Sequence, residues 1–183
     1  MPPTGGSSTA RFYYDLASPE AYLVAERALH ALGEVPEWIP IRDDSLAFRC
    51  AAEVDAYKED VERRAAALGL MALRWPDAFP ADTDWAMLAA TYAKQIGRGV
   101  AFSLAAFRQA FAAGRDLSER DNVLIAAAAC EMHPAALVKG AALRGTREAL
   151  EANAERARAD GVTSVPAIWA GGRLLEGERA VPA

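Results

Sequence analysis

The chain has 183 residues, and 52% of them are hydrophobic, so it can bury the core of one domain with or without a large insertion. Its net charge of −5, from 25 acidic and 20 basic residues, argues against nucleic acid or an anionic membrane as the main partner. The only cysteines, Cys50 and Cys130, are too far apart in sequence for a C-x-x-C motif, and with only two histidines no metal site is expected. No apolar run approaches the roughly 20 residues that span a bilayer.

The first predicted elements are a strand and a helix. Residues 1–9, rich in Pro, Gly, Ser and Thr, lack the features of a secretory signal and are predicted to be a disordered lead-in. Residues 10–16 are aromatic and predict a buried strand. Ser18 is a favoured N-cap and Pro19 a favoured first helical residue, so a helix should begin here and end near Gly33.

The middle of the chain is predicted to be helical. Residues 35–41 favour a second strand near a sheet edge, which would complete a right-handed βαβ unit. Helical patterns then follow, most of them closed by glycine. They cover residues 52–68, 85–96, 101–113, a segment capped by Ser118 and ending at residue 131, and one or two helices within 135–159.

The pattern returns to β-structure at the end. Residues 167–170 and 173–175 predict two short strands, and Gly171-Gly172 between them is typical of a tight hairpin. The sequence therefore predicts an α/β domain formed by residues 10–45 and 160–183, with a helical insertion at 46–159. Cys50 and Cys130 are expected to be small, buried or half-buried residues.

The predicted chemistry depends on two turns, one at Ser18 and one at Val165–Pro166. Ser18 lies at the positive end of a helix dipole with free backbone N–H groups, where a thiolate is stabilised and its pKa is lowered. The Ser18 hydroxyl can donate a hydrogen bond to that sulfur but cannot form a disulfide with it. If the Val165–Pro166 bond is cis, the Val165 backbone faces outward and can pair with an extended, peptide-like ligand.

Four segments, in order, carry a family resemblance: FYYDLASPEAYL (12–23), RWPDAFPADT (74–83), FRQAFAAGRDLS (107–118) and GVTSVPAIWAGGRLLEGER (161–179). Together they resemble the 2-hydroxychromene-2-carboxylate isomerases and kappa-class glutathione transferases of the DsbA-like thioredoxin superfamily. The resemblance runs nearly the whole chain and implies a thioredoxin-like fold with a large all-helical insertion. Glu20 stands where that family has an aromatic residue.

The resemblance also implies roles for particular residues. Ser18 would contact the sulfur of glutathione, or of another low-molecular-weight thiol, with Pro19 and Glu20 beside it. Val165, before Pro166, would pair with the cofactor backbone. Glu178 and Arg179 would hold its polar end, and Trp75, Pro76 and Phe79 would line a substrate pocket or simply pack under a loop.

We therefore expect a cytoplasmic thiol-dependent isomerase or transferase that acts on an aromatic-derived or conjugated carbonyl compound; the family resemblance suggests a homodimer. One alternative is a dithiol–disulfide oxidoreductase of the same fold, which the absence of cysteine at positions 18 and 21 disfavours. The other is a relative without redox activity that acts as a binding module.

Overall fold

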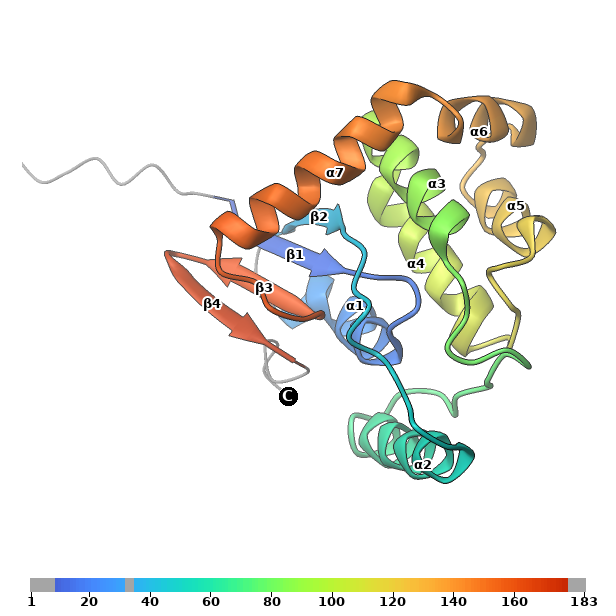
Figure 1. Ribbon diagram of the computed structural model, residues 1–183, viewed down its shortest axis with the longest axis vertical. Coiled ribbons are helices and arrows are strands. Elements are labelled where there is room, and N and C mark those ends of the chain that lie inside the picture. Colours follow the sequence, from blue (N-terminus) through green and yellow to red (C-terminus); the bar gives the residue numbers. More distant parts are fainter. Residues whose placement is uncertain (1–8, 32–34, 178–183) are drawn as a thin grey trace, which may run out of the picture.

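The computed structural model describes residues 9–31 and 35–177 (Figure 1). Residues 1–8 of the predicted lead-in at 1–9, the end of the first helix near Gly33, and the residues Glu178 and Arg179 lie outside the described part. The strands are β1 (Arg11–Tyr14), β2 (Glu37–Pro40), β3 (Ala167–Ala170) and β4 (Arg173–Glu176). The helices are α1 (Pro19–Ala31), α2 (Ala51–Ala67), α3 (Asp84–Gln95), α4 (Gly99–Phe111), α5 (Arg120–Ala129), α6 (Pro134–Ala141) and α7 (Arg144–Ala159).

The four strands form one sheet in the order β2-β1-β3-β4. β1 and β2 are parallel and are joined through α1, which confirms the predicted βαβ unit. β3 is antiparallel to β1, and β4 is antiparallel to β3. The hairpin between β3 and β4 turns at Gly171 and Gly172, whose φ angles of 57° and 79° suit glycine.

Alternate residues of β1 face opposite sides of the sheet. Phe12 and Tyr14 belong to the larger core cluster, in which Tyr14 packs on Phe107 of α4. Tyr13 faces the other side, in a smaller cluster with Ile39, Val165 and Ala157 of α7. Figure 1 shows α1 and α7 on opposite faces of the sheet.

α7 connects the helical region to the sheet. The amide of Asn153 donates a hydrogen bond to the Pro40 carbonyl at 3.0 Å, and Arg156 forms an ion pair with Glu37 at 3.0 Å. The predicted boundary between the helical insertion and the core domain, at residues 159 and 160, stays a prediction. The last half of α7, which lies on the insertion side of that boundary, covers the second face of the sheet.

Two local expectations differ from the structure. Ser118 was expected to cap a helix, but α5 begins at Arg120 with Glu119 as its N-cap, and the Ser118 N–H instead donates to Asp116 Oδ1. Cys50 is exposed rather than buried or half-buried, because it precedes the first turn of α2, whereas Cys130 is buried as expected. Among the described helices, none is both long and apolar enough to cross a bilayer.

Asp160 fastens the end of α7 to β1. The Arg11 guanidinium donates to Asp160 Oδ1 at 2.7 Å, and the Tyr13 hydroxyl donates to Oδ2 at 2.5 Å. Burial opposes ionisation of Asp160, but these hydrogen bonds and the charges of Arg11 and Arg156 outweigh it and lower its pKa. The ionised carboxylate therefore stabilises the fold.

Replacing Asp160 with asparagine should lower the free energy of unfolding by about 2 kcal/mol at neutral pH, because Arg11 loses its charged partner. Urea denaturation from pH 2 to 8 measures this. The contribution is complete above the ordinary pKa of 3.8 and is lost as the pH falls through the lowered folded pKa, so the difference between the two proteins should shrink in acid. Glu148→Gln, which breaks an exposed pair with Arg144, is the control and should change stability by less than about 0.5 kcal/mol.

Candidate functional site

Ser18 caps α1 at the turn that follows β1. Its Oγ accepts a hydrogen bond from the Ala21 N–H at 3.1 Å, and its carbonyl accepts from the Tyr22 N–H at 3.2 Å. Pro19 occupies the first helical position, as the sequence predicts. Ser18 is only 7% exposed, and its hydroxyl hydrogen has no acceptor among the described residues. The cap therefore leaves one donor available at the positive end of α1.

Asp15 joins three loops at this turn. Its Oδ1 accepts from the Ala17 N–H at 2.9 Å and from the Thr83 hydroxyl at 3.0 Å, and its Oδ2 accepts from the Asp43 N–H at 2.9 Å. Burial raises the pKa of Asp15, and these three hydrogen bonds oppose that shift without cancelling it. Asp15 was not among the predicted site residues, although an aspartate that bonds the backbone two residues on is a recurrent turn signal.

The Val165–Pro166 bond is cis. The Val165 N–H donates to Asp43 Oδ2 at 2.8 Å, and the other carboxylate oxygen of Asp43 accepts from the Ser45 N–H at 2.9 Å. Asp15 and Asp43 thus link the Ser18 turn to the Val165 loop by consecutive hydrogen bonds. The N–H expected to meet a ligand is already paired with Asp43, while the Val165 carbonyl accepts no hydrogen bond from the described residues.

Glu20 faces α2. Its Oε1 accepts from the Arg64 guanidinium at 2.9 Å, and both side chains are a little over one quarter exposed. Burial, together with the charge of Glu20, raises the pKa of Tyr57 on the same helix. In place of the aromatic residue of the resembled family, this chain has a carboxylate that helps to dock α2 against the start of α1.

Of the three predicted pocket residues, Pro76 and Phe79 lie beside the Ser18 turn. Trp75 and Phe79 stack edge to face with their ring centroids 4.9 Å apart. Pro76 and Phe79 line a cavity beside Ala17 of only about 10 Å³, which holds no substrate. In this arrangement they pack under a loop, and their role in substrate binding stays a prediction.

A larger pocket of about 420 Å³ opens next to Ala17, and we call it the acidic pocket. Its lining comes from the Ser18 turn, the loop after β2 and the loop before α3. The lining residues are Asp15, Ala17, Arg42, Asp43, Asp44, Leu46, Pro80, Ala81, Asp82, Thr83 and Asp84. Because the aspartates outnumber the single arginine, the pocket favours a neutral or cationic group over an anionic one. Within residues 9–31 and 35–177, no three acidic, histidine or cysteine side chains are grouped to hold a metal ion.

The fold is shared with enzymes of two kinds. At 16% identity, the structure is similar to that of a 2-hydroxychromene-2-carboxylate isomerase, with a TM-score of 0.81 over 94% of this chain and 90% of that chain. It is also similar to a probable DsbA oxidoreductase from Streptomyces coelicolor, at 19% identity and a TM-score of 0.75 over 93% and 83% of the two chains. A third similar structure is the cytosolic disulfide reductase DsbM from Pseudomonas aeruginosa with GSH, at 14% identity and a TM-score of 0.69 over 92% and 88%.

At these identities the similarity concerns the fold alone. No curated protein sequence matches the chain. The model of the DSBA-like thioredoxin domain matches residues 9–183, which include the Ser18 turn, the helices and the Val165 loop. The chain therefore belongs to the DSBA-like thioredoxin domain family.

Proposed function

We propose that the protein is a thiol-dependent isomerase or transferase, similar to 2-hydroxychromene-2-carboxylate isomerase, that acts on an aromatic-derived or conjugated carbonyl compound. Its cofactor would be glutathione or another low-molecular-weight thiol. The observation that carries the proposal is a serine, in place of a cysteine, at the N-terminus of α1, in a turn that Asp15 and Asp43 connect to the cis-proline loop.

The residues at the turn suit a thiolate. Ser18 has a free hydroxyl hydrogen to donate to sulfur, and the dipole of α1 adds to the stabilisation of a negative charge there. When bound, the thiol supplies a nucleophilic sulfur that can add to a carbon conjugated with a carbonyl group. The Val165 carbonyl can accept from a backbone N–H of the cofactor, and the acidic pocket suits its ammonium group better than its carboxylates.

The predicted cofactor contacts of Glu20, Glu178 and Arg179 have less direct support. Glu20 would act on the cofactor through the position of α2, because its carboxylate is paired with Arg64. Glu178 and Arg179 lie outside the described residues, so their contact with the polar end of the cofactor rests on the family resemblance.

Replacing Ser18 with alanine should lower kcat/KM by about tenfold or more, because a hydrogen bond to a charged sulfur is lost. Initial rates with glutathione across a panel of conjugated carbonyl compounds measure this. Ser18→Thr keeps both the hydroxyl and the helix cap and is the matched control; it should retain most of the activity. The proposal is wrong if glutathione and related thiols give no thermal shift and Ser18→Ala leaves the activity unchanged.

The second candidate function is a binding module related to the DsbA oxidoreductases but without redox activity. The low exposure of Ser18 and the occupied Val165 N–H favour it, since both leave little of the turn accessible. With Ser18 and Ala21 in place of two cysteines, neither candidate should reduce insulin. A Ser18-dependent thermal shift with glutathione separates the two, because only the enzyme requires a thiol.

We extend the proposal to the partners and the location of the protein. Its substrate would be a small molecule, with neither nucleic acid nor membrane as partner, and it would work as a homodimer. A cytoplasmic location agrees with its two free cysteines, Cys50 and Cys130. Analytical ultracentrifugation tests the dimer.

A further inference from the structure

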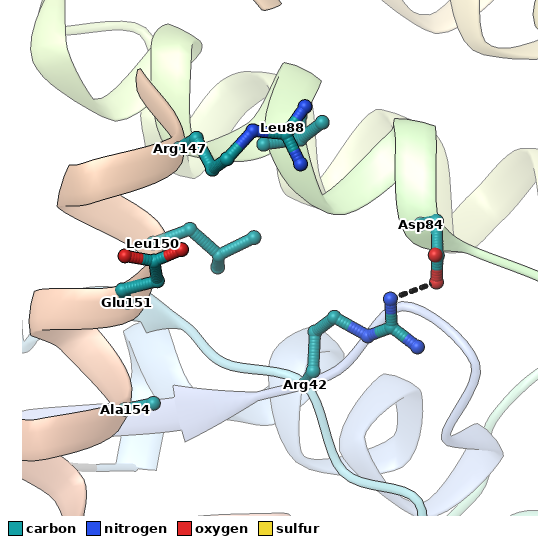
Figure 2. A pocket seen from close by; sticks show the side chains of 7 residues that line it. All are labelled: Arg42, Asp84, Leu88, Arg147, Leu150, Glu151 and Ala154. Atoms are coloured by element: carbon teal, nitrogen blue, oxygen red, sulfur yellow. Dashed lines mark ion pairs between the residues drawn. The ribbon is translucent and has the colours of Figure 1, made fainter. Parts of the chain in front are cut away.

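A pocket of about 240 Å³ lies between α3 and α7, and we call it the α3–α7 pocket. Figure 2 shows its lining, which comes from the loop after β2, the start of α3 and the first turns of α7. The lining residues are Arg42, Asp84, Leu88, Arg147, Leu150, Glu151 and Ala154. The pocket shares Arg42 and Asp84 with the acidic pocket, but none of its residues belongs to the Ser18 turn.

The floor of the α3–α7 pocket is apolar. Leu150 is buried, and Leu88 and Ala154 are half-buried. Positions 147, 150, 151 and 154 are three or four residues apart, so they share the face of α7 that is turned toward α3. In Figure 2 the Leu150 side chain extends toward the middle of the pocket. Its size suits a single ring or a short branched chain, since drug-sized ligands need about 300 Å³ or more.

The two arginines at the rim of the pocket, Arg42 and Arg147, differ in their ion pairs with described residues. Arg42 forms an ion pair with Asp84, shown as a dashed line in Figure 2. Arg147 lies on the opposite side of Leu150 in that view and has no ion pair with any described residue. By contrast, Arg144, one turn earlier on α7, is paired with Glu148 at 2.6 Å.

The position of Arg147 along α7 strengthens its attraction for an anion. It belongs to the first turn of the helix, which contains no acidic residue. The dipole of α7 is positive at this end, so an arginine there adds to an existing positive potential. Glu151 lies one turn further along the same face and disfavours a second negative charge on a ligand. The surroundings therefore suit a single carboxylate at Arg147.

We infer that the α3–α7 pocket binds a small monocarboxylate whose apolar part is a single ring or a branched chain. The ligand carboxylate accepts hydrogen bonds from the Arg147 guanidinium, whose planar fork matches a carboxylate. The apolar part lies on Leu88, Leu150 and Ala154. This binding is independent of the thiol proposed at Ser18.

Isothermal titration of the full chain with benzoate and 3-phenylpropionate tests the inference. Benzylamine, benzyl alcohol and the dicarboxylate phthalate are the comparison ligands and should bind at least about tenfold more weakly, since each lacks the single carboxylate or adds a second one. Arg147→Gln should weaken the binding of benzoate or 3-phenylpropionate by about tenfold or more. Arg144→Gln, which removes the same charge one turn away, should leave it unchanged, as should Ser18→Ala.

A second variant tests the floor of the pocket. Ala154→Phe fills the space beside Leu150 and should abolish carboxylate binding while leaving both arginines in place. The inference is overturned if no monocarboxylate binds, if Arg147→Gln and Arg144→Gln weaken binding equally, or if benzylamine binds as tightly as benzoate. It is also overturned if Ala154→Phe binds the carboxylate like the unmodified protein.

Discussion

Replacing Asp15, which is only 4% exposed, with alanine should lower the free energy of unfolding by about 3 kcal/mol, because it leaves three donors around a buried carboxylate without an acceptor. The donors are the N–H groups of Ala17 and Asp43 and the hydroxyl of Thr83. They come from three loops, so the loss should also loosen the turn that holds Ser18. Urea denaturation followed by far-UV circular dichroism measures the change.

The neighbouring acidic residues supply controls. Asp44→Ala removes an exposed carboxylate 3.5 Å from Arg42 and should change stability by less than about 0.5 kcal/mol. Asp15→Asn retains an acceptor and should cost less than Asp15→Ala. Equal stabilities of Asp15→Ala and Asp44→Ala would contradict the role of Asp15 as the residue that joins the loops.

The pH dependence of Asp15→Asn gives a further check. Burial raises the folded pKa of Asp15 above its ordinary value of 3.8, so its protonated form is favoured in the fold. Its contribution to stability is complete below 3.8 and decreases as the pH rises through the folded pKa. The advantage of the unmodified protein over Asp15→Asn should therefore be largest in acid, opposite to the trend expected for Asp160.

The local parts of the site could be predicted from short stretches of sequence. Ser18 and Pro19 start α1 because their preferences act within one helical turn. Gly171 and Gly172 form the predicted hairpin because few other residues adopt two consecutive positive φ angles. The fold class was predicted from the order of these signals and the family resemblance, and the family match confirms it.

The connections between these parts could not be predicted in the same way. Asp43 is 28 residues from Asp15 and 122 residues from Val165, and no periodic pattern links such positions. The partner of Glu20 is Arg64 on α2, and the position of α2 depends on the whole chain between these two residues. A charged loop residue has many possible partners in sequence, and only the folded chain selects one.

The contact between Asp43 and Val165 leads to an expected gain in thiol affinity. If the protein binds glutathione as proposed, Asp43→Ala should tighten that binding by about tenfold, because the Val165 N–H becomes free to donate to a carbonyl of the peptide. In the unmodified protein the Asp43 carboxylate holds that N–H at 2.8 Å, and a ligand must displace it. Isothermal titration with glutathione measures the change.

Two comparisons separate this effect from the loss of a negative charge near an anionic ligand. Asp44→Ala removes the same charge from the acidic pocket but no hydrogen bond to Val165, so it should tighten glutathione binding much less than Asp43→Ala. 2-Mercaptoethanol has a thiol but no peptide carbonyl, and Asp43→Ala should leave its binding unchanged. Equal gains for the two alanine variants would show that charge alone governs the affinity. If glutathione binding depends on Ser18 but is no tighter in Asp43→Ala, the thiol site at Ser18 is supported and a contact between Val165 and the cofactor is excluded.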